Sequence, residues 1–429
     1  MDYQYKYLKY KNKYLQIKNN KNQVAGQSND QSNGQSNDQS NGQSNDQSNG
    51  QSNDQSNGQS KDQPLNLHQN ISDANNSFTI KLFENLEGAS NIYSPLSVVV
   101  ALSLVHLAAL GNTDRQLTKL FNYKYSKDDL EEICKLFKND DVKMVNMILI
   151  NKDYKINPAY INMINDMAII IQDNFENGPK IAAQINNYIG KKTNGLIKNL
   201  VDANDIKDNM IFVLINTIYF KAEWENKFKS HKTTKMKFHK TNMVDMMYQK
   251  SDFNYYENSK IQAIEMPYKN SNIVMGVILP KRYLEEDNMD YSANNVPIIS
   301  SSEINEIINN MSFTEVKLYL PKFTQRKNLE LVPILRKMGV IDLFDSNYAD
   351  LNIASKKSFV SKIIHEAVVI VDENGTEATA ATTIFDIDMM ANPMMKKPEI
   401  IFKADHAFIY YIRYVPSNLF LFYGDYQGV

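Results

Sequence analysis

The side chains of this sequence that could do nucleophilic or metal chemistry are few, and their spacing supports neither kind of site. The six histidines never fall at separations typical of two imidazoles sharing one zinc ion, and His365-Glu366 lacks a second histidine at the fourth position. Cys134 is the one cysteine, which excludes an intramolecular disulfide and a CxxC motif. We therefore expect no metal and no cofactor.

Two common catalytic motifs are also missing. None of the fifteen glycines belongs to a G-x-S-x-G sequence, the turn that presents the serine of α/β-hydrolases. Gly190 and Gly195 have the spacing of a phosphate-binding loop, but Leu196 stands where a lysine would reach the phosphates. His106 lies in an apolar run, where a hydrogen-bonded core histidine is expected. These patterns indicate that the protein is not an enzyme.

Charge and hydropathy exclude two further classes. The 429 residues include 47 Lys and Arg against 49 Asp and Glu, a net charge of -2, so we expect no nucleic-acid partner. The longest nearly apolar run, residues 98–110, is interrupted by Ser103 and His106 and is too short to cross a bilayer. The lysine-rich start lacks the continuous apolar stretch of a signal peptide. We expect no membrane span and no secretion by the ordinary route.

Three segments of different composition divide the chain. Residues 1–26 are basic and rich in Tyr and Lys, with Tyr7, Tyr10 and Tyr14 at helical spacing. This segment is either an amphipathic helix for a partner or anionic surface, or a frayed polar arm. Residues 27–63 contain nine tetrads of the QSND/QSNG type and should be a disordered linker, because they offer almost nothing to bury. Residues 64–429 have the composition of a globular domain.

Helices are expected in the first half of this domain and strands in the second. Residues 97–109 predict a buried helix closed by Gly111-Asn112, and a helical run from Ile185 ends at Gly195. Strand-length apolar segments follow at 210–220, 272–280, 316–321, 367–371, 399–402, 407–414 and 419–423. The fold class is therefore α+β with large, mostly antiparallel sheets.

One connection is unusually long. Residues 372–398 separate two predicted strands, and a loop of 27 residues in a compact domain is either functional or disordered. After Gly375 it carries small side chains, and Thr376, Ala378, Ala380 and Thr382 would share one face. Such a segment could enter an existing sheet as a strand without overpacking the layer beneath it.

At these residues the sequence resembles the serpin family. Glu373-Asn-Gly-Thr-Glu-Ala378 and the residues up to Thr382 are similar to the proximal hinge of inhibitory serpins. Further family motifs follow in order over residues 70–429: Asn91-Ile-Tyr-Ser-Pro-Leu-Ser97, Ala109-Leu-Gly-Asn-Thr113, Ile185-Asn-Asn-Tyr188, Thr193-Asn-Gly195, Asn216-Thr-Ile-Tyr-Phe-Lys-Ala-Glu-Trp224, Leu318-Tyr-Leu-Pro-Lys-Phe323, Lys337-Met-Gly339, Phe402-Lys-Ala-Asp-His-Ala-Phe408 and Leu421-Phe-Tyr-Gly424.

The resemblance implies helices packed on three β-sheets, a large central sheet and an exposed reactive-centre loop at about residues 373–398. It implies a suicide inhibitor that a target serine protease cleaves in this loop, after which the loop inserts into the central sheet. Trp224 matches a family tryptophan and is expected mainly to pack. The implied hinge residues are Glu373, Gly375, Thr376, Glu377, Ala378, Ala380, Ala381 and Thr382. The implied polar cluster under the sheet, the shutter, is Ser94, Ser97, Asn216 and His365.

The family's usual loop length places the cleaved bond between Met389 and Met390, a methionine site that suits chymotrypsin-like or elastase-like proteases. Counting back from Phe402 instead places it about four residues later. Asp388 is an alternative for a caspase-like cysteine protease, and Lys396 for a trypsin-like enzyme. A non-inhibitory serpin with a chaperone or structural role is a further alternative, which predicts simple cleavage.

The Tyr, Lys, Ile and Asn bias and the tetrads are similar to proteins of large AT-rich DNA viruses, which suggests a viral protein that acts on a host protease as a monomer. Asn374-Gly-Thr376 is a glycosylation sequon at the hinge, where a glycan would obstruct insertion. The expected location is therefore the host cytoplasm or the virion, with the extracellular space of most serpins as the alternative. Residues 117–147 carry no dense basic row, so we expect no heparin-type activation.

Overall fold

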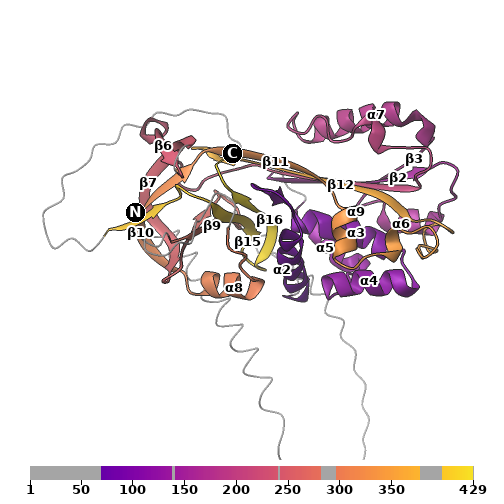
Figure 1. The fold of residues 1–429 in the computed structure, drawn as a ribbon, viewed down its shortest axis with the longest axis horizontal. Coiled ribbons are helices and arrows are strands. Elements are labelled where there is room, and N and C mark those ends of the chain that lie inside the picture. Colours follow the sequence, from indigo (N-terminus) through magenta and orange to yellow (C-terminus); the bar gives the residue numbers. More distant parts are fainter. Residues whose placement is uncertain (1–68, 138–140, 240–241, 282–295, 377–398, 429) are drawn as a thin grey trace, which may run out of the picture. The chain divides into compact units, whose positions relative to one another are not determined.

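A seven-stranded central sheet organises the computed structural model, which describes residues 69–137, 141–239, 242–281, 296–376 and 399–428 (Figure 1). The strand order is β3-β2-β4-β12-β13-β5, and β11 pairs with β12 beside this path. Most neighbours are antiparallel, but β4 and β12 run parallel in the middle of the sheet. The strands are β2 (Val142–Asn151), β3 (Ile169–Asp173), β4 (Phe212–Phe220), β5 (Ala222–Glu223), β11 (Phe323–Glu330), β12 (Val360–Val371) and β13 (Gly375–Thr376).

A second sheet of nine strands has the order β1-β16-β15-β9-β8-β7-β10-β14, with β6 paired to β7. The 16-residue strand β7 pairs with β6, β8 and β10 along its length. These pairings join into one sheet the strands that were expected to form two sheets besides the central one. The described residues thus form two hydrogen-bonded sheets rather than three. The strands are β1 (Ile92–Tyr93), β6 (Thr234–Phe238), β7 (Asn242–Glu257), β8 (Ile261–Pro267), β9 (Ile273–Pro280), β10 (Ser312–Pro321), β14 (Ile400–Lys403), β15 (Phe408–Tyr414) and β16 (Leu419–Tyr426).

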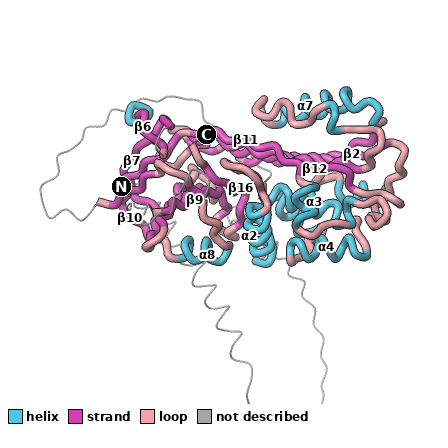
Figure 2. The backbone as a smooth tube through the Cα atoms, viewed as in Figure 1, coloured by secondary structure: helices cyan, strands magenta, loops and turns pink. Residues whose placement is uncertain are grey.

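Helices cover both faces of the central sheet, as Figures 1 and 2 show for α7 on one side and α3 and α4 on the other. The helices are α2 (Gln69–Glu84), α3 (Pro95–His106), α4 (Gly111–Phe121), α5 (Lys127–Leu136), α6 (Pro158–Ile164), α7 (Gly178–Lys192), α8 (Ser301–Asn309) and α9 (Val332–Lys337). Short 3-10 turns lie at Phe175–Asn177, Ala203–Asp205, Ser230–Lys232 and Asp342–Phe344. In the described part of the chain, no helix is long and apolar enough to span a bilayer.

Two clusters of buried side chains explain why every residue of β4 is buried. The larger cluster includes Leu214 and Ile218 of β4, and the smaller one joins Val213 and Ile215 to Ile185 of α7. Because neighbouring strand residues point to opposite faces, a strand covered on both faces needs a continuous apolar run.

The helix α3 begins two residues earlier than the predicted start at residue 97. The Ser94 hydroxyl accepts a hydrogen bond from the Ser97 backbone N–H, and Pro95 occupies the first turn, where its missing N–H is not needed. The predicted closure at Gly111-Asn112 is wrong: α3 ends at His106, and Gly111 is instead the first residue of α4, with φ of +56°. Glycine adopts that backbone conformation without strain, which suits either end of a helix.

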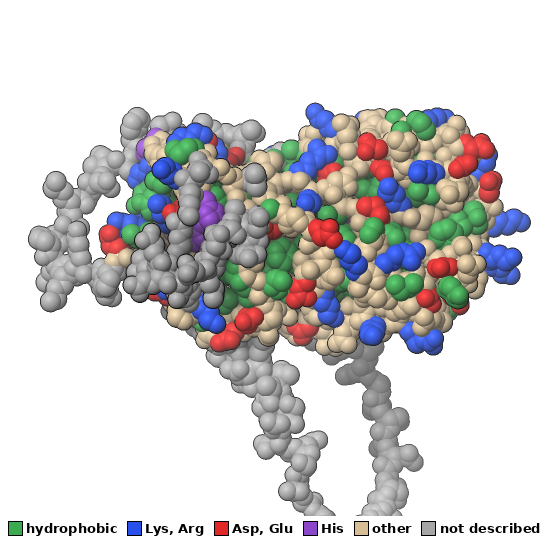
Figure 3. Space-filling model, in the orientation of Figure 1, with side chains coloured by type: hydrophobic (Ala, Val, Ile, Leu, Met, Phe, Trp, Pro, Cys, Tyr) green, Lys and Arg blue, Asp and Glu red, His purple; other side chains and the backbone are tan. Residues whose placement is uncertain are grey.

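The surface mixes both charges. On the face shown in Figure 3, Lys and Arg side chains alternate with Asp and Glu over the described residues, and neither sign dominates. This distribution agrees with the near-balanced composition and offers no extended basic stripe on that face for a nucleic-acid backbone.

Candidate functional site

The predicted functional residues that the structure describes lie around the line where β4 pairs with β12, which we call the seam. The two parallel strands pair from Phe212 with Val360 to Tyr219 with Val368, with a shift of one residue at Ser361. The β12 strand then turns at residues 372–374, and β13 comes back antiparallel to it. The β13 strand also pairs with β5, which follows β4 after a single residue. A chain continuing from β13 would therefore head into the seam.

The structure brings the four predicted shutter residues together under this seam. His365 Nε2 accepts the Ser94 backbone N–H at 3.1 Å, so Nδ1 carries the proton and donates to Asn216 Oδ1 at 2.6 Å. The Ser97 hydroxyl donates to the same Asn216 oxygen at 2.6 Å. Asn146 of β2, which sequence reasoning missed, accepts from Asn216 Nδ2 at 2.6 Å.

This cluster spans four elements: the start of α3 and the strands β2, β4 and β12. His365 is completely buried, and burial lowers the pKa of its imidazole to about 3, so it is neutral near pH 7. The bonds between Asn216 and His365 cross the seam, which means that separating β4 from β12 must break them. Buried polar groups left without partners are costly, so the cluster holds the seam closed.

The first hinge residue, Glu373, is held by an ion pair and a hydrogen bond. Its carboxylate lies 2.7 Å from Lys322 Nζ and accepts the Thr233 hydroxyl at 2.8 Å. Burial acts to raise the pKa of Glu373, but the bonds from Lys322 and Thr233 outweigh it and leave the pKa below its usual value. The Phe228 backbone N–H also donates to the Glu373 carbonyl at 2.9 Å. The hinge is thus attached to the body of the domain at its base.

The next residues are already inside the sheet. Gly375 and Thr376 form β13 and are buried, and the Thr376 hydroxyl is hydrogen-bonded to Tyr268 at 2.7 Å. A Cβ atom at Gly375 would lie 2.1 Å from the Ala222 carbonyl oxygen, so only glycine fits against β5. The expectation of a loop exposed from residue 373 is wrong for 373–376, because Gly375 and Thr376 pair with β5 and β12, and the carbonyls of Glu373 and Asn374 accept backbone hydrogen bonds from Phe228 and Trp224.

Trp224 does more than pack. Its ring stacks on Tyr268 at 4.5 Å, and its indole N–H donates to the Asp372 carbonyl at 2.9 Å. Its backbone N–H donates to the Asn374 carbonyl at 2.9 Å. The side chain and the main chain of one residue therefore fix the turn at residues 372–374.

Several predicted residues cannot be placed. These residues lie outside the described ranges: Glu377, Ala378, Ala380, Ala381 and Thr382 of the predicted hinge, and the reactive-bond candidates Asp388, Met389, Met390 and Lys396.

The other titratable candidates are structural. His106 is buried and contacts the Asp114 carboxylate at 3.0 Å, as a core histidine does. Within the described ranges, no group of three or more His, Cys, Asp and Glu side chains could hold a metal ion.

The fold and the seam define an α+β protein whose central sheet carries a parallel seam beside a hinged loop. A family model described as serpin (serine protease inhibitor) matches residues 73–427. An uncharacterized serpin-like protein of Acanthamoeba polyphaga mimivirus is 49% identical over 366 residues, which are 85% of this chain and 91% of that protein. Leukocyte elastase inhibitor A of Mus musculus is 33% identical over 384 residues, 83% of this chain and 98% of that protein.

A solved structure supports the same assignment of the fold. The crystal structure of Serpin48, described as a highly specific serpin of the insect Tenebrio molitor, is similar with a TM-score of 0.71 at 24% identity, and the match covers 87% of this chain and 100% of that one. The chain belongs to the serpin family, whose members are mostly protease inhibitors rather than enzymes.

Because the buried histidine of the shutter is neutral, we predict that the free energy of unfolding decreases as the pH is lowered. The unfolded chain binds a proton on His365 near pH 6.5 and the folded protein only near 3, so its contribution is complete above 6.5 and is lost as the pH falls towards 3. At pH 5 the expected loss is about 2 kcal/mol. Urea unfolding at pH 7.5 and 5 measures it, and His365→Gln should remove most of this pH dependence. His231→Gln changes an exposed histidine and is the control, which should retain the pH dependence. An equal change in unfolding free energy between pH 7.5 and 5 in both variants would contradict this role of His365.

Proposed function

We propose that this protein is a suicide inhibitor of a serine endopeptidase, which it traps by inserting its cleaved loop between β4 and β12. The observation that carries the proposal is β13. Its two residues occupy the top of the sheet between β12 and β5, antiparallel to both. Residues that follow Thr376 need only continue in the same direction to separate β4 from β12.

Insertion would replace one parallel pairing by two antiparallel ones. Antiparallel pairs are slightly more stable per residue than parallel ones, and a new central strand satisfies its backbone groups on both sides. The small residues Ala378 and Ala380 and the β-branched Thr382 favour a strand that packs between two covered faces. These properties supply a driving force for insertion. Before cleavage the loop is attached at both of its ends, which would prevent it from inserting.

In the proposed reaction, the serine hydroxyl of the protease attacks the Met389 carbonyl carbon and releases the amino group of Met390. The ester that joins the enzyme to Met389 normally reacts with water. Insertion competes with that step by carrying the attached protease to the far end of the sheet. The balance of these two rates decides between a stable 1:1 complex and a cleaved, inactive inhibitor.

The proposed target class rests on Met389 and on a relative. Mouse leukocyte elastase inhibitor A is named for an elastase, and a methionine at the cleaved bond suits an elastase-like or chymotrypsin-like enzyme. A viral source for this chain is supported by its mimivirus relative. We therefore propose a host protease as target and the host cytoplasm or the virion as location, with the protein acting as a monomer.

The direct test mixes the full-length protein with chymotrypsin, elastase, trypsin and a caspase. We expect an SDS-stable 1:1 adduct with chymotrypsin or elastase, and a released C-terminal fragment that begins at Met390 by mass spectrometry. Cleaved protein should also melt at a higher temperature than intact protein, because the inserted strand adds a ladder of backbone hydrogen bonds. Cleavage by all four proteases without adduct or heat stabilisation would instead indicate a non-inhibitory serpin.

A substitution at Thr376 should separate cleavage from trapping. This side chain is completely buried, and an arginine there would bury an unpaired charge or expel β13 from the sheet. Thr376→Arg should be cleaved at the same bond but should give at least about tenfold less adduct per cleaved molecule, which corresponds to about 1.4 kcal/mol in relative barrier height. Thr376→Ser keeps the hydroxyl that meets Tyr268 and is the matched control. Undiminished adduct from Thr376→Arg would argue against insertion at β13.

The cleaved bond can be assigned with three variants. Met389→Glu should slow adduct formation with chymotrypsin or elastase at least about tenfold, because their substrate pockets disfavour a buried charge. Asp388→Ala should leave that rate within a factor of two and would matter only for a caspase. Lys396→Ala should be neutral except towards trypsin. A strong effect of Asp388→Ala combined with none of Met389→Glu would move the target class to cysteine proteases.

A further inference from the structure

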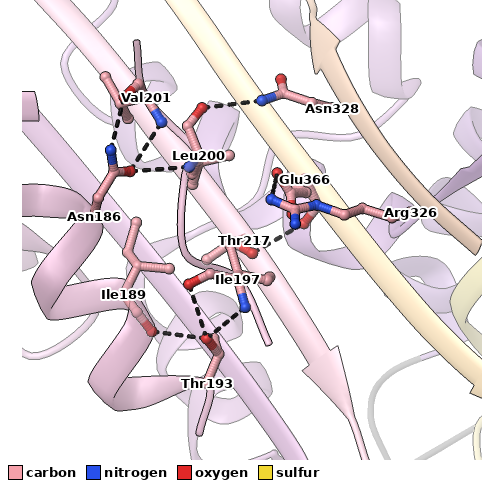
Figure 4. Close-up of polar contacts among 10 residues, drawn as sticks. All are labelled: Asn186, Ile189, Thr193, Ile197, Leu200, Val201, Thr217, Arg326, Asn328 and Glu366. Atoms are coloured by element: carbon pink, nitrogen blue, oxygen red, sulfur yellow. Dashed lines mark hydrogen bonds and ion pairs between the residues drawn. The ribbon is translucent and has the colours of Figure 1, made fainter. Parts of the chain in front are cut away.

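The connector between α7 and β4, residues 193–211, crosses the seam on the face opposite the shutter. It begins at the end of α7 and leads into β4 at Phe212. Between these points it bonds to strands on the other side of the seam. Asn328 of β11 donates to the Leu200 carbonyl at 3.0 Å, and Lys362 of β12 lies 2.6 Å from the Asp205 carboxylate. Figure 4 shows the bond from Asn328 to Leu200.

The connector is fastened more firmly on its own side. Asn186 of α7 accepts the backbone N–H groups of Leu200 and Val201 at 2.9 and 3.0 Å and donates to the Val201 carbonyl at 2.8 Å (Figure 4). The Thr193 hydroxyl donates to the Ile189 carbonyl at 2.8 Å and accepts the Ile197 N–H at 3.2 Å. The connector is therefore fastened to α7, and both pack on the sheet through the smaller apolar cluster, which contains residues of β4 and of β12.

The two contacts to β11 and β12 span the line along which the sheet must part. In the register of the sheet, Asn328 pairs with Glu366 of β12, and Glu366 pairs with Thr217 of β4. On the same row, the Thr217 hydroxyl donates to the Glu366 carbonyl at 3.0 Å, and Arg326 Nε lies 2.6 Å from the Glu366 carboxylate (Figure 4). The side-chain bonds on this row tie β11 to β12, β12 to β4, and the connector to β11.

A strand added between β4 and β12 would move them apart by one further strand spacing, about 4.8 Å. A hydrogen bond of 3.0 Å cannot stretch that far. If the connector stays with α7 and β4, its bonds to Asn328 and Lys362 must break; if it stays with β11 and β12, the bonds to Asn186 must break. The far side is the weaker attachment. Its side-chain bonds come from Asn328, from the part-exposed Lys362 and from Ser361, whose hydroxyl accepts the Ile211 N–H at 2.9 Å, whereas the connector is covalently continuous with α7 and β4.

We propose that Asn328 and Lys362 are positioning residues that set the rate of sheet opening, because they hold the α7 connector across the seam. Their bonds exist in the closed sheet and are lost as it opens, so each raises the barrier to insertion. The inference rests on the proposed function, because it concerns the rate of that same insertion step.

The test measures insertion without any protease. A synthetic peptide with the sequence of residues 376–389 is incubated with intact full-length protein, and its uptake is followed by native gel electrophoresis and by fluorescence. The chain has a single tryptophan, Trp224, which contacts the hinge turn at the top of the sheet and reports on that site. Asn328→Ala and Lys362→Gln should each speed peptide uptake between about two- and tenfold, and the double variant should exceed both.

Matched controls remove similar bonds elsewhere on the surface. Asn310 donates to the Glu306 carbonyl within one helix end, and Lys337 of α9 pairs with Glu87, outside the central sheet. Asn310→Ala and Lys337→Gln should leave the uptake rate unchanged. Urea unfolding of the peptide-free proteins supplies the second readout, because a merely structural role would lower the unfolding midpoint without accelerating uptake.

The outcomes separate this inference from the proposed function. If the wild-type protein takes up the peptide, and Asn328→Ala and Lys362→Gln take it up at the same rate, the proposed role of these two residues is overturned and the inhibitor proposal is left intact. Equal acceleration by the control variants would overturn it as well. A wild-type protein that takes up no peptide, and gains no heat stability after loop cleavage, would overturn both proposals together.

Discussion

The parallel pairing of β4 with β12 is the constraint on which the rest of the structure depends. Both strands are covered on both faces, and such strands are normally permanent parts of a sheet. Here the chain that leaves β12 turns back at once and pairs antiparallel to it, in line with the seam. The pairing therefore extends over eight residues of β4 and yet lies next to a segment that could replace it.

Polar groups rather than apolar contacts hold the seam at its most buried point. An apolar contact gains free energy only from the area it removes from water, whereas a buried hydrogen-bond cluster is sensitive to the arrangement of every partner. Asn216 uses its oxygen for His365 and Ser97 and its nitrogen for Asn146. Such a cluster resists partial opening strongly, but its members can find new partners once a whole strand with free backbone groups has entered.

Local patterns in the sequence predicted the strands on both sides of the seam and a buried helix at α3, though not its cap at Ser94. They did not reveal features that depend on register between distant segments. The pairing of Gly375 with β5, the ion pair of Glu373 with Lys322 and the place of Asn146 each join residues more than fifty positions apart. Gly111 shows a different limit: a glycine with positive φ suits either end of a helix, so its type alone does not say which end it occupies.

The two faces of the seam differ in what opening does to them. On the core side, the shutter bonds join side chains of β2, β4, β12 and α3, and those side chains remain neighbours of whatever strand lies between them. On the α7 side, the connector is covalently continuous with β4 but bonded to β11 and β12, so opening leaves it attached to only one of two separating bodies. An interaction broken on the way to the open sheet raises the barrier in either case, but one that is re-formed afterwards cancels from the equilibrium, whereas one that stays broken also disfavours the inserted state. The core face would therefore act mainly on the rate of insertion, and the α7 face would act on both the rate and the stability of the inserted state.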